Sequence, residues 1–117
     1  MRFTRIAGVG HYVPERVVTN KDLEKVMDTS DEWIQERSGI VERRFVDEGT
    51  GCSDLAERAT KRALAHAGWQ PGDVQFIVFA TLSPDLFFPG TGVLLQERLG
   101  LPGVGAIDIR NQCTGFV

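Results

Sequence analysis

The sequence has 117 residues, of which 42% are hydrophobic and 25% are charged, and its 13 Lys and Arg against 16 Asp and Glu give a formal net charge of −3. This composition is typical of one globular domain, and the acidic balance argues against nucleic acid or an anionic membrane as the main partner. We find no secretory leader and no apolar run of about 18 residues that would span a bilayer, so we expect a cytoplasmic protein.

The first expected element is a strand over residues 3–10. It contains Gly8 and Gly10, but the third glycine of a dinucleotide-binding fingerprint would fall at Val13, and Pro14 follows where a helix should open. We therefore expect these glycines to permit close backbone packing instead.

Two short helices should follow. Asn20 is the expected N-cap of the first. The second is predicted over residues 30–38, because Thr29 and Glu32 have the spacing of a capping box and Gly39 is a natural stop.

Trp33 and Arg37 are four residues apart and so share one face of that second helix. On an exposed face, the indole ring can stack on a base while the guanidinium pairs with phosphate. Alternatively, Trp33 lies in the core and Arg37 is a surface charge, and spacing alone favours this second interpretation.

After an irregular connection or hairpin, a helix is predicted over residues 53–67, where a stripe of small residues would pack closely against a sheet. His66, near its end, is interpreted as structural. The near-continuous apolar runs at residues 74–80 and 104–109 predict strands buried on both faces, with a further helix between them. This order predicts an α/β fold with a parallel or mixed sheet.

Two cysteines and two histidines are too few and too widely spaced for a disulfide framework or a metal site, so we expect no metal. Cys113 follows the last strand. If a helix opens there, its N-terminus would favour the thiolate and its amides could hold an oxyanion. A small buried thiol is the alternative, and the pattern leaves both open.

Five segments together carry a resemblance to a known family. They are "GVGHYVPERVVTN", "DTSDEWIQERSGIVERR", "SDLAERATKRALAHAG", "FIVFATLSPDLFFPGTG" and "DIRNQCTGFV". With these segments the chain resembles the N-terminal third of β-ketoacyl-ACP synthase III, a condensing enzyme of the thiolase fold. The resemblance implies the N-terminal part of a thiolase-like layered αβαβα fold with a mixed sheet, with residues 1–117 an incomplete N-terminal half.

The resemblance also implies roles for individual residues. Cys113 matches the nucleophile that takes an acyl group from acyl-CoA. Trp33 resembles the residue that stacks on the CoA adenine, and Arg37 with Thr29 match the region that contacts the CoA phosphates. Phe88, with Phe87 beside it, resembles the residue that crosses a homodimer interface to shape the partner's acyl pocket.

The implied activity is that of an acyltransferase that starts fatty-acid synthesis. An acyl-CoA starter, which is a substrate and not a cofactor, would acylate the cysteine, and malonyl-ACP would then attack by decarboxylative Claisen condensation. The implied partners are acyl carrier protein, a second copy of the chain and a C-terminal segment of the same fold. That segment would carry the family's catalytic His and Asn, because His11 and His66 match non-catalytic parts, so we expect this chain alone to be inactive.

Asn111 and Gln112 depart from the small residues that the family usually has before the cysteine. They leave open a related condensing enzyme of secondary metabolism or one that uses longer acyl chains. Among enzymes, a related thiolase-fold protein that uses acyl-CoA, including chemistry like that of hydroxymethylglutaryl-CoA synthase, is the alternative. A non-catalytic partner subunit is the alternative outside enzymes.

Overall fold

The computed structural model describes residues 3–116. The chain divides into two compact units. The smaller unit comprises residues 13–49, and the larger unit comprises the residues up to Tyr12 together with those from Thr50 onward. Within the described residues, no helix has the length and apolar character needed to cross a bilayer.

The smaller unit is built from two short strands and two short helices. In chain order these are β1 (Arg16–Thr19), α1 (Asn20–Leu23), α2 (Asp31–Ser38) and β2 (Glu42–Phe45). Strands β1 and β2 pair antiparallel, with Arg16 opposite Phe45 and Thr19 opposite Glu42. An irregular connection or a hairpin was expected after α2. That segment contains strand β2, and β2 pairs with β1, which precedes α1.

The N-cap of each helix in the smaller unit lies one residue away from the predicted N-cap. Thr19, not Asn20, caps α1, and its hydroxyl and backbone pair reciprocally with Asp22. Ser30, not Thr29, caps α2 by accepting a hydrogen bond from the backbone N–H of Trp33 at 3.1 Å. In both places two suitable cap residues stand side by side, so the residue type alone does not decide which of them caps the helix.

The larger unit contains one long helix and a β–α–β motif. Its elements are α3 (Cys52–Ala67), β3 (Phe76–Ala80), α4 (Thr91–Arg98) and β4 (Gly105–Ile109), with 3₁₀ turns at Pro71–Asp73 and Gln112–Phe116. Strands β3 and β4 are parallel, with Phe76 opposite Gly105 and Ala80 opposite Ile109. The predicted helix–strand–helix–strand order and the parallel pairing are confirmed.

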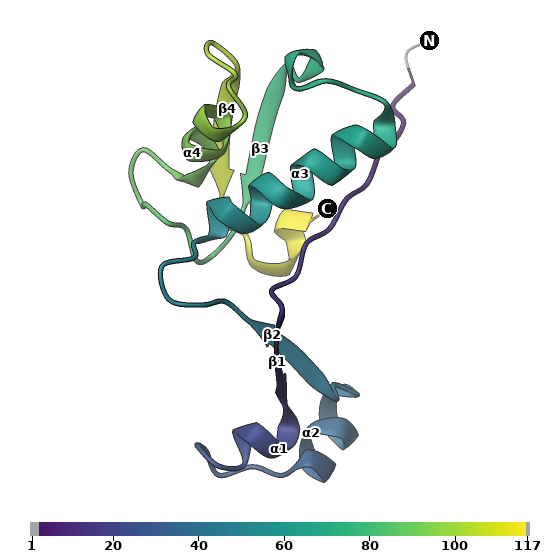
Figure 1. The fold of residues 1–117 in the computed structure, drawn as a ribbon, viewed down its shortest axis with the longest axis vertical. Helices are drawn as coiled ribbons and strands as arrows, with labels where there is room; N and C mark the ends of the chain where they lie inside the picture. The colour runs from purple at the N-terminus through teal and green to yellow at the C-terminus, as the bar shows by residue number, and fades with distance from the viewer. Residues whose placement is uncertain (1–2, 117) are drawn as a thin grey trace. The chain divides into compact units, whose positions relative to one another are not determined.

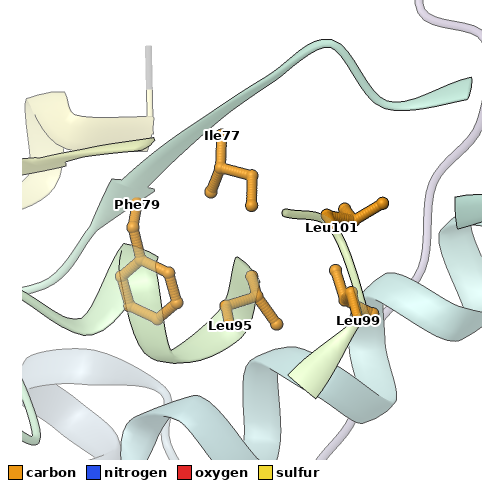
Figure 2. Close-up of a cluster of buried hydrophobic side chains, with 5 residues drawn as sticks. All are labelled: Ile77, Phe79, Leu95, Leu99 and Leu101. Atoms are coloured by element: carbon orange, nitrogen blue, oxygen red, sulfur yellow. The ribbon is translucent and has the colours of Figure 1, made fainter. Parts of the chain in front are cut away.

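The core of the larger unit lies between β3 and α4. Ile77 and Phe79 point from β3 toward Leu95 of α4, and Leu99 and Leu101 close the cluster at the end of that helix (Figure 2). Alternate residues of a strand face the same side, which is why this pair from β3 meets the helix.

Both β3 and β4 were predicted to be buried on both faces, and within the described residues both predictions are wrong. No residue of β4 is fully buried, and Ile107 is 48% exposed. Strand β3 alternates between buried and exposed positions, and Phe76 and Val78 on its outward face are 54% and 57% exposed. The reason is that α4 covers the face of Ile77 and Phe79, whereas nothing between residues 3 and 116 buries Phe76 or Val78.

The strand predicted over residues 3–10 is also not formed in the described structure. This segment instead runs along α3 (Figure 1). A Cβ atom added to Gly8 would stand 2.5 Å from the carbonyl oxygen of Ala63, and one added to Gly10 would clash with the backbone of Ala59 and Ala63. The expectation of close backbone packing is therefore confirmed, and the small residues of α3 serve it.

Candidate functional site

The sequence-predicted site residues fall into two groups, one in each unit. Thr29, Trp33 and Arg37 belong to the smaller unit, and Phe87, Phe88 and Cys113 belong to the larger unit.

Cys113 follows β4 after a sharp change of chain direction. Gln112, directly before it, has φ of 42°, a left-handed conformation that is uncommon for a residue other than glycine. The cysteine is exposed and is the second residue of the 3₁₀ turn Gln112–Phe116. Thr114 closes this turn by donating its hydroxyl to the carbonyl oxygen of Asn111 at 2.7 Å. Residues 3–116 do not bury Cys113, so the interpretation as a small buried thiol is wrong within the described residues.

Asp108 fixes the strand that leads to Cys113 against the start of α4. Its carboxylate accepts hydrogen bonds from the backbone N–H groups of Thr91 and Gly92, both at 2.7 Å. A Cβ atom at Gly90 or Gly92 would stand within 3 Å of this carboxylate, so the two glycines make room for it. A charged residue inside an apolar strand was the available signal for this role, and sequence reasoning missed it.

Asp85 performs the same task at the start of α3. It accepts hydrogen bonds from the backbone N–H groups of Cys52 and Ser53, the latter at 2.9 Å. The backbone N–H of Asp85 donates to the hydroxyl of Thr91 at 2.9 Å, and the side chain of Thr91 is fully buried. The loop between β3 and α4 is thus attached to both helices of the larger unit.

The same loop presents two phenylalanines to solvent. Phe87 is 75% exposed and Phe88 is 90% exposed. Arg110, just beyond β4, donates to the carbonyl oxygen of Phe87 at 3.1 Å and places its guanidinium 4.9 Å from the centre of that ring. The loop tip is therefore joined to the segment that carries Cys113.

In the smaller unit, Trp33 borders an open cavity of about 330 Å³ that Asp28, Thr29 and Ser30 complete. Trp33 is 55% exposed, so the interpretation that places this side chain in the core is wrong within the described residues. The guanidinium of Arg37 lies 5.8 Å from the centre of the indole ring, as their shared face predicts. The hydroxyl of Thr29 is buried and has no hydrogen-bond partner within residues 3–116.

A hydrogen-bonded group of polar side chains supports this cavity. Asn20 donates to Asp31 at 2.7 Å, and Asp31 also accepts a bond from Gln35 at 2.8 Å. These two bonds, with that from Asn20 the larger effect, hold the pKa of the Asp31 carboxyl below its usual range. Arg43 donates to the amide oxygen of Asn20 at 2.6 Å. Sequence reasoning treated Asn20 only as a cap.

The remaining candidate groups have structural partners. His66 accepts a hydrogen bond at Nδ1 from the backbone N–H of Val9 at 3.1 Å, in agreement with its interpretation as structural. Cys52 is half-buried, with its sulfur 3.6 Å from the hydroxyl of Thr81. No cluster of potential metal ligands occurs in the part of the chain that the structure describes.

Comparison with known proteins agrees in sequence and in fold. The chain is 53% identical over 115 residues to β-ketoacyl-[acyl-carrier-protein] synthase III of Xylella fastidiosa, covering 98% of this chain and 36% of the relative. It is also 53% identical over 112 residues to the protein of the same name from Geobacillus kaustophilus, covering 96% of this chain and 36% of that protein. No protein-family profile matches the chain.

Two crystal structures superpose on nearly all of it. 3-Oxoacyl-[acyl-carrier-protein] synthase III of Aquifex aeolicus matches with a TM-score of 0.91 and 47% identity, covering 97% of this chain and 37% of that one. The priming β-ketosynthase of a polyketide biosynthetic pathway matches with a TM-score of 0.92 and 35% identity, covering 98% of this chain and 34% of that one. The expected thiolase-like α/β fold class is confirmed. The chain thus spans about a third of the length of these relatives, and over that length it is similar in sequence and in fold to β-ketoacyl-[acyl-carrier-protein] synthase III.

Proposed function

We propose that this chain carries the acyl-accepting cysteine and the CoA contacts of a β-ketoacyl-ACP synthase III. In the first step, the Cys113 thiolate attacks the thioester carbonyl of acyl-CoA, a new C–S bond forms, and CoA leaves as its thiolate. In the second step, malonyl-ACP loses CO₂, and the resulting carbanion attacks the acyl-cysteine. A C–C bond forms, the C–S bond to Cys113 breaks, and the thiolate is restored.

The observation that carries this proposal is the exposed Cys113 thiol at the sharp turn after β4, in a chain that matches synthase III relatives throughout. A strand followed by a tight turn is a recurrent way to expose a nucleophile at the edge of an α/β sheet. The hydrogen bonds from Thr91 and Gly92 to Asp108 support the proposal further, because they hold that strand end in place.

The proposed CoA site is the face of α2 that holds Trp33 and Arg37. An exposed indole ring offers a stacking surface for adenine, and Arg37 makes no ion pair within residues 3–116 that would compete with phosphate. The unpartnered Thr29 hydroxyl beside the cavity is available to a polar group of the ligand. These features favour binding by α2 over a purely structural role for its aromatic residue.

We further propose a cytoplasmic homodimer in which Phe87 and Phe88 cross to the partner and shape its acyl pocket. Two large apolar side chains at an exposed loop tip favour such a contact. The domain in this proposal is completed by a C-terminal segment of the same fold, which covers the outward face of β3 and supplies the further catalytic groups. That face is apolar at Phe76 and Val78.

A related condensing enzyme of secondary metabolism, or one that uses longer acyl chains, is the second candidate. Asn111 and Gln112 favour it because they bring polar bulk to the positions before the cysteine. The match to the polyketide priming synthase extends over as much of the chain as the match to the Aquifex protein.

The test is acylation of the full-length protein by a panel of acyl-CoAs from acetyl to long-chain, followed by mapping of the modified residue by mass spectrometry. We expect one adduct on Cys113 that Cys113→Ala removes and Cys52→Ser, which removes the other described thiol, does not. The preferred chain length distinguishes the two candidates. Absence of an adduct with every acyl-CoA would refute the enzyme and favour a non-catalytic partner subunit.

A further inference from the structure

The most buried polar side chain of the smaller unit is Asn20, which is 1% exposed. Both hydrogens of its amide and one of the two acceptor positions of its oxygen are used. The nitrogen donates to Asp31 at 2.7 Å and to the carbonyl oxygen of Ile40 at 2.8 Å, and the oxygen accepts from Arg43 at 2.6 Å. One side chain therefore connects the start of α1 with the first turn of α2 and with β2.

Only an amide satisfies these three partners at once. A carboxylate of the same shape would keep the bond from Arg43, but it would face the carboxylate of Asp31 and the carbonyl oxygen of Ile40 without a proton to donate. A smaller apolar side chain would remove one hydrogen bond from each of the three partners at a partly buried place, which is costly.

The partner Asp31 is the first residue of α2, next to the cavity wall. Its backbone N–H donates to the Glu24 carboxylate at 2.7 Å, so this residue is held through both side chain and backbone. The three residues that precede it, 28–30, line the cavity, together with Trp33 one turn of helix later. A shift of the first turn of α2 would therefore move Trp33, and with it the hydrogen bond that joins Trp33 to Ser30 at the cavity wall.

We propose that Asn20 is the positioning residue of the nucleotide end of the acyl-CoA site, which sets the place of the α2 first turn without touching the ligand. The inference rests on the proposed function, because it takes the cavity beside Trp33 to hold the nucleotide. It adds that affinity for CoA, and not the rate of the acyl transfer at Cys113, depends on this buried amide.

The test compares variants of the full-length enzyme with acetyl-CoA and malonyl-ACP as substrates. Asn20→Asp should raise the KM for acetyl-CoA roughly tenfold and leave kcat and the KM for malonyl-ACP within about twofold. Combining Asn20→Asp with Asp31→Asn restores a donor and an acceptor with exchanged roles, so we expect the KM to recover in part. Asn20→Ala supplies a second variant with the same expected direction if the first does not fold.

Val18→Ala is the matched control, because Val18 is a buried residue of β1 that makes no side-chain bond to α2. It should lower the melting temperature while the KM for acetyl-CoA stays unchanged. The Kd for CoA can be measured by the fluorescence of Trp33 in a Trp69→Phe background, in which Trp33 is the remaining tryptophan among the described residues. In that background Asn20→Asp should raise the Kd for CoA by the same factor as it raises the KM.

Two results distinguish a failure of the positioning role of Asn20 from a failure of the proposed CoA site. If Trp33→Ala raises the KM for acetyl-CoA but Asn20→Asp and Asn20→Ala do not, the positioning role is refuted and the proposed site stands. If Trp33→Ala leaves both the KM and the Kd unchanged, the proposed CoA site is refuted and the role of Asn20 with it. An equal rise in KM with Val18→Ala would also overturn the inference, because it would show general loss of stability.

Discussion

Removal of the Asp108 carboxylate should loosen the start of α4 and the end of β4 together. Asp108 accepts two backbone hydrogen bonds at 2.7 Å, one of them from Thr91, whose side chain is fully buried. The variant Asp108→Ala leaves both N–H groups without their acceptor. Two hydrogen bonds to a charged group would contribute about 3–6 kcal/mol, whereas loss of a whole N-cap costs only about 0.5–2 kcal/mol. We expect a loss between these two ranges, about 2–4 kcal/mol.

Amide hydrogen exchange measures this effect locally. Since about 1.4 kcal/mol corresponds to a factor of ten, the amides of Thr91 and Gly92 should exchange roughly 30- to 700-fold faster in Asp108→Ala. Asp85→Ala is the matched control, because it removes the equivalent cap of α3 and should accelerate the amides of Cys52 and Ser53 instead. Unchanged exchange at Thr91 and Gly92 in Asp108→Ala would refute the reasoning.

Three further predictions concern packing and pH. Gly10→Ala should lower the free energy of unfolding by about 1–3 kcal/mol, because its new methyl group meets the backbone of Ala63; a stability equal to wild type in urea unfolding would contradict the contact. Leu95→Ala should cost about 2–5 kcal/mol in the same assay, and a loss below about 1 kcal/mol would mean that the cluster in Figure 2 is not a packed core. The hydrogen bond from Asn20 is the main cause that lowers the pKa of the Asp31 carboxyl. The contribution of Asp31 to stability is therefore complete above the ordinary aspartate pKa of 3.8 and is lost as the pH falls below that value. Asp31→Asn should make the stability less dependent on pH in this acid range, and an unchanged pH dependence would contradict the assignment.

The sequence predicted the β3–α4–β4 motif because long periodic elements leave a clear pattern. The apolar runs around Ile77 and Ile107, with a helix between them, have few other solutions than parallel strands joined by a crossover helix. The end of α3 was also predictable, because glycine readily adopts the left-handed conformation that ends a helix. Gly68 has this conformation, with φ of 71°.

Features that depend on contacts between distant residues were not predictable. Strand β2 has the sequence Glu42–Phe45 with only one apolar residue, and it forms by pairing with β1 across 23 residues or more. The segment 3–10 has the composition of a strand but lies against α3, where Gly8 and Gly10 fit closely. Hydrogen bonds join Asp108 to α4 and Asn20 to α2 across 11 to 17 positions in the chain, a separation that local patterns do not encode.

Of the candidate site, the sequence predicted the cysteine after β4 and the common face of Trp33 and Arg37. It did not predict which face of α2 would be free, because an aromatic residue at helical spacing fits a core equally well. The resemblance to synthase III favoured exposure, and the 55% exposure of Trp33 agrees with that interpretation. The positive φ of Gln112 before Cys113 is likewise a tertiary feature that no residue type announces.

The most direct test of the central claim is the mass of the tryptic peptide that begins at Asn111, after incubation of the full-length protein with acetyl-CoA and a longer acyl-CoA. The proposed mechanism predicts that this peptide gains one acyl group in place of the thiol proton of Cys113, and that hydroxylamine or malonyl-ACP removes it. An unmodified peptide with every acyl-CoA, or an acyl group found on Cys52 instead, would contradict the assignment of Cys113 as the acyl acceptor.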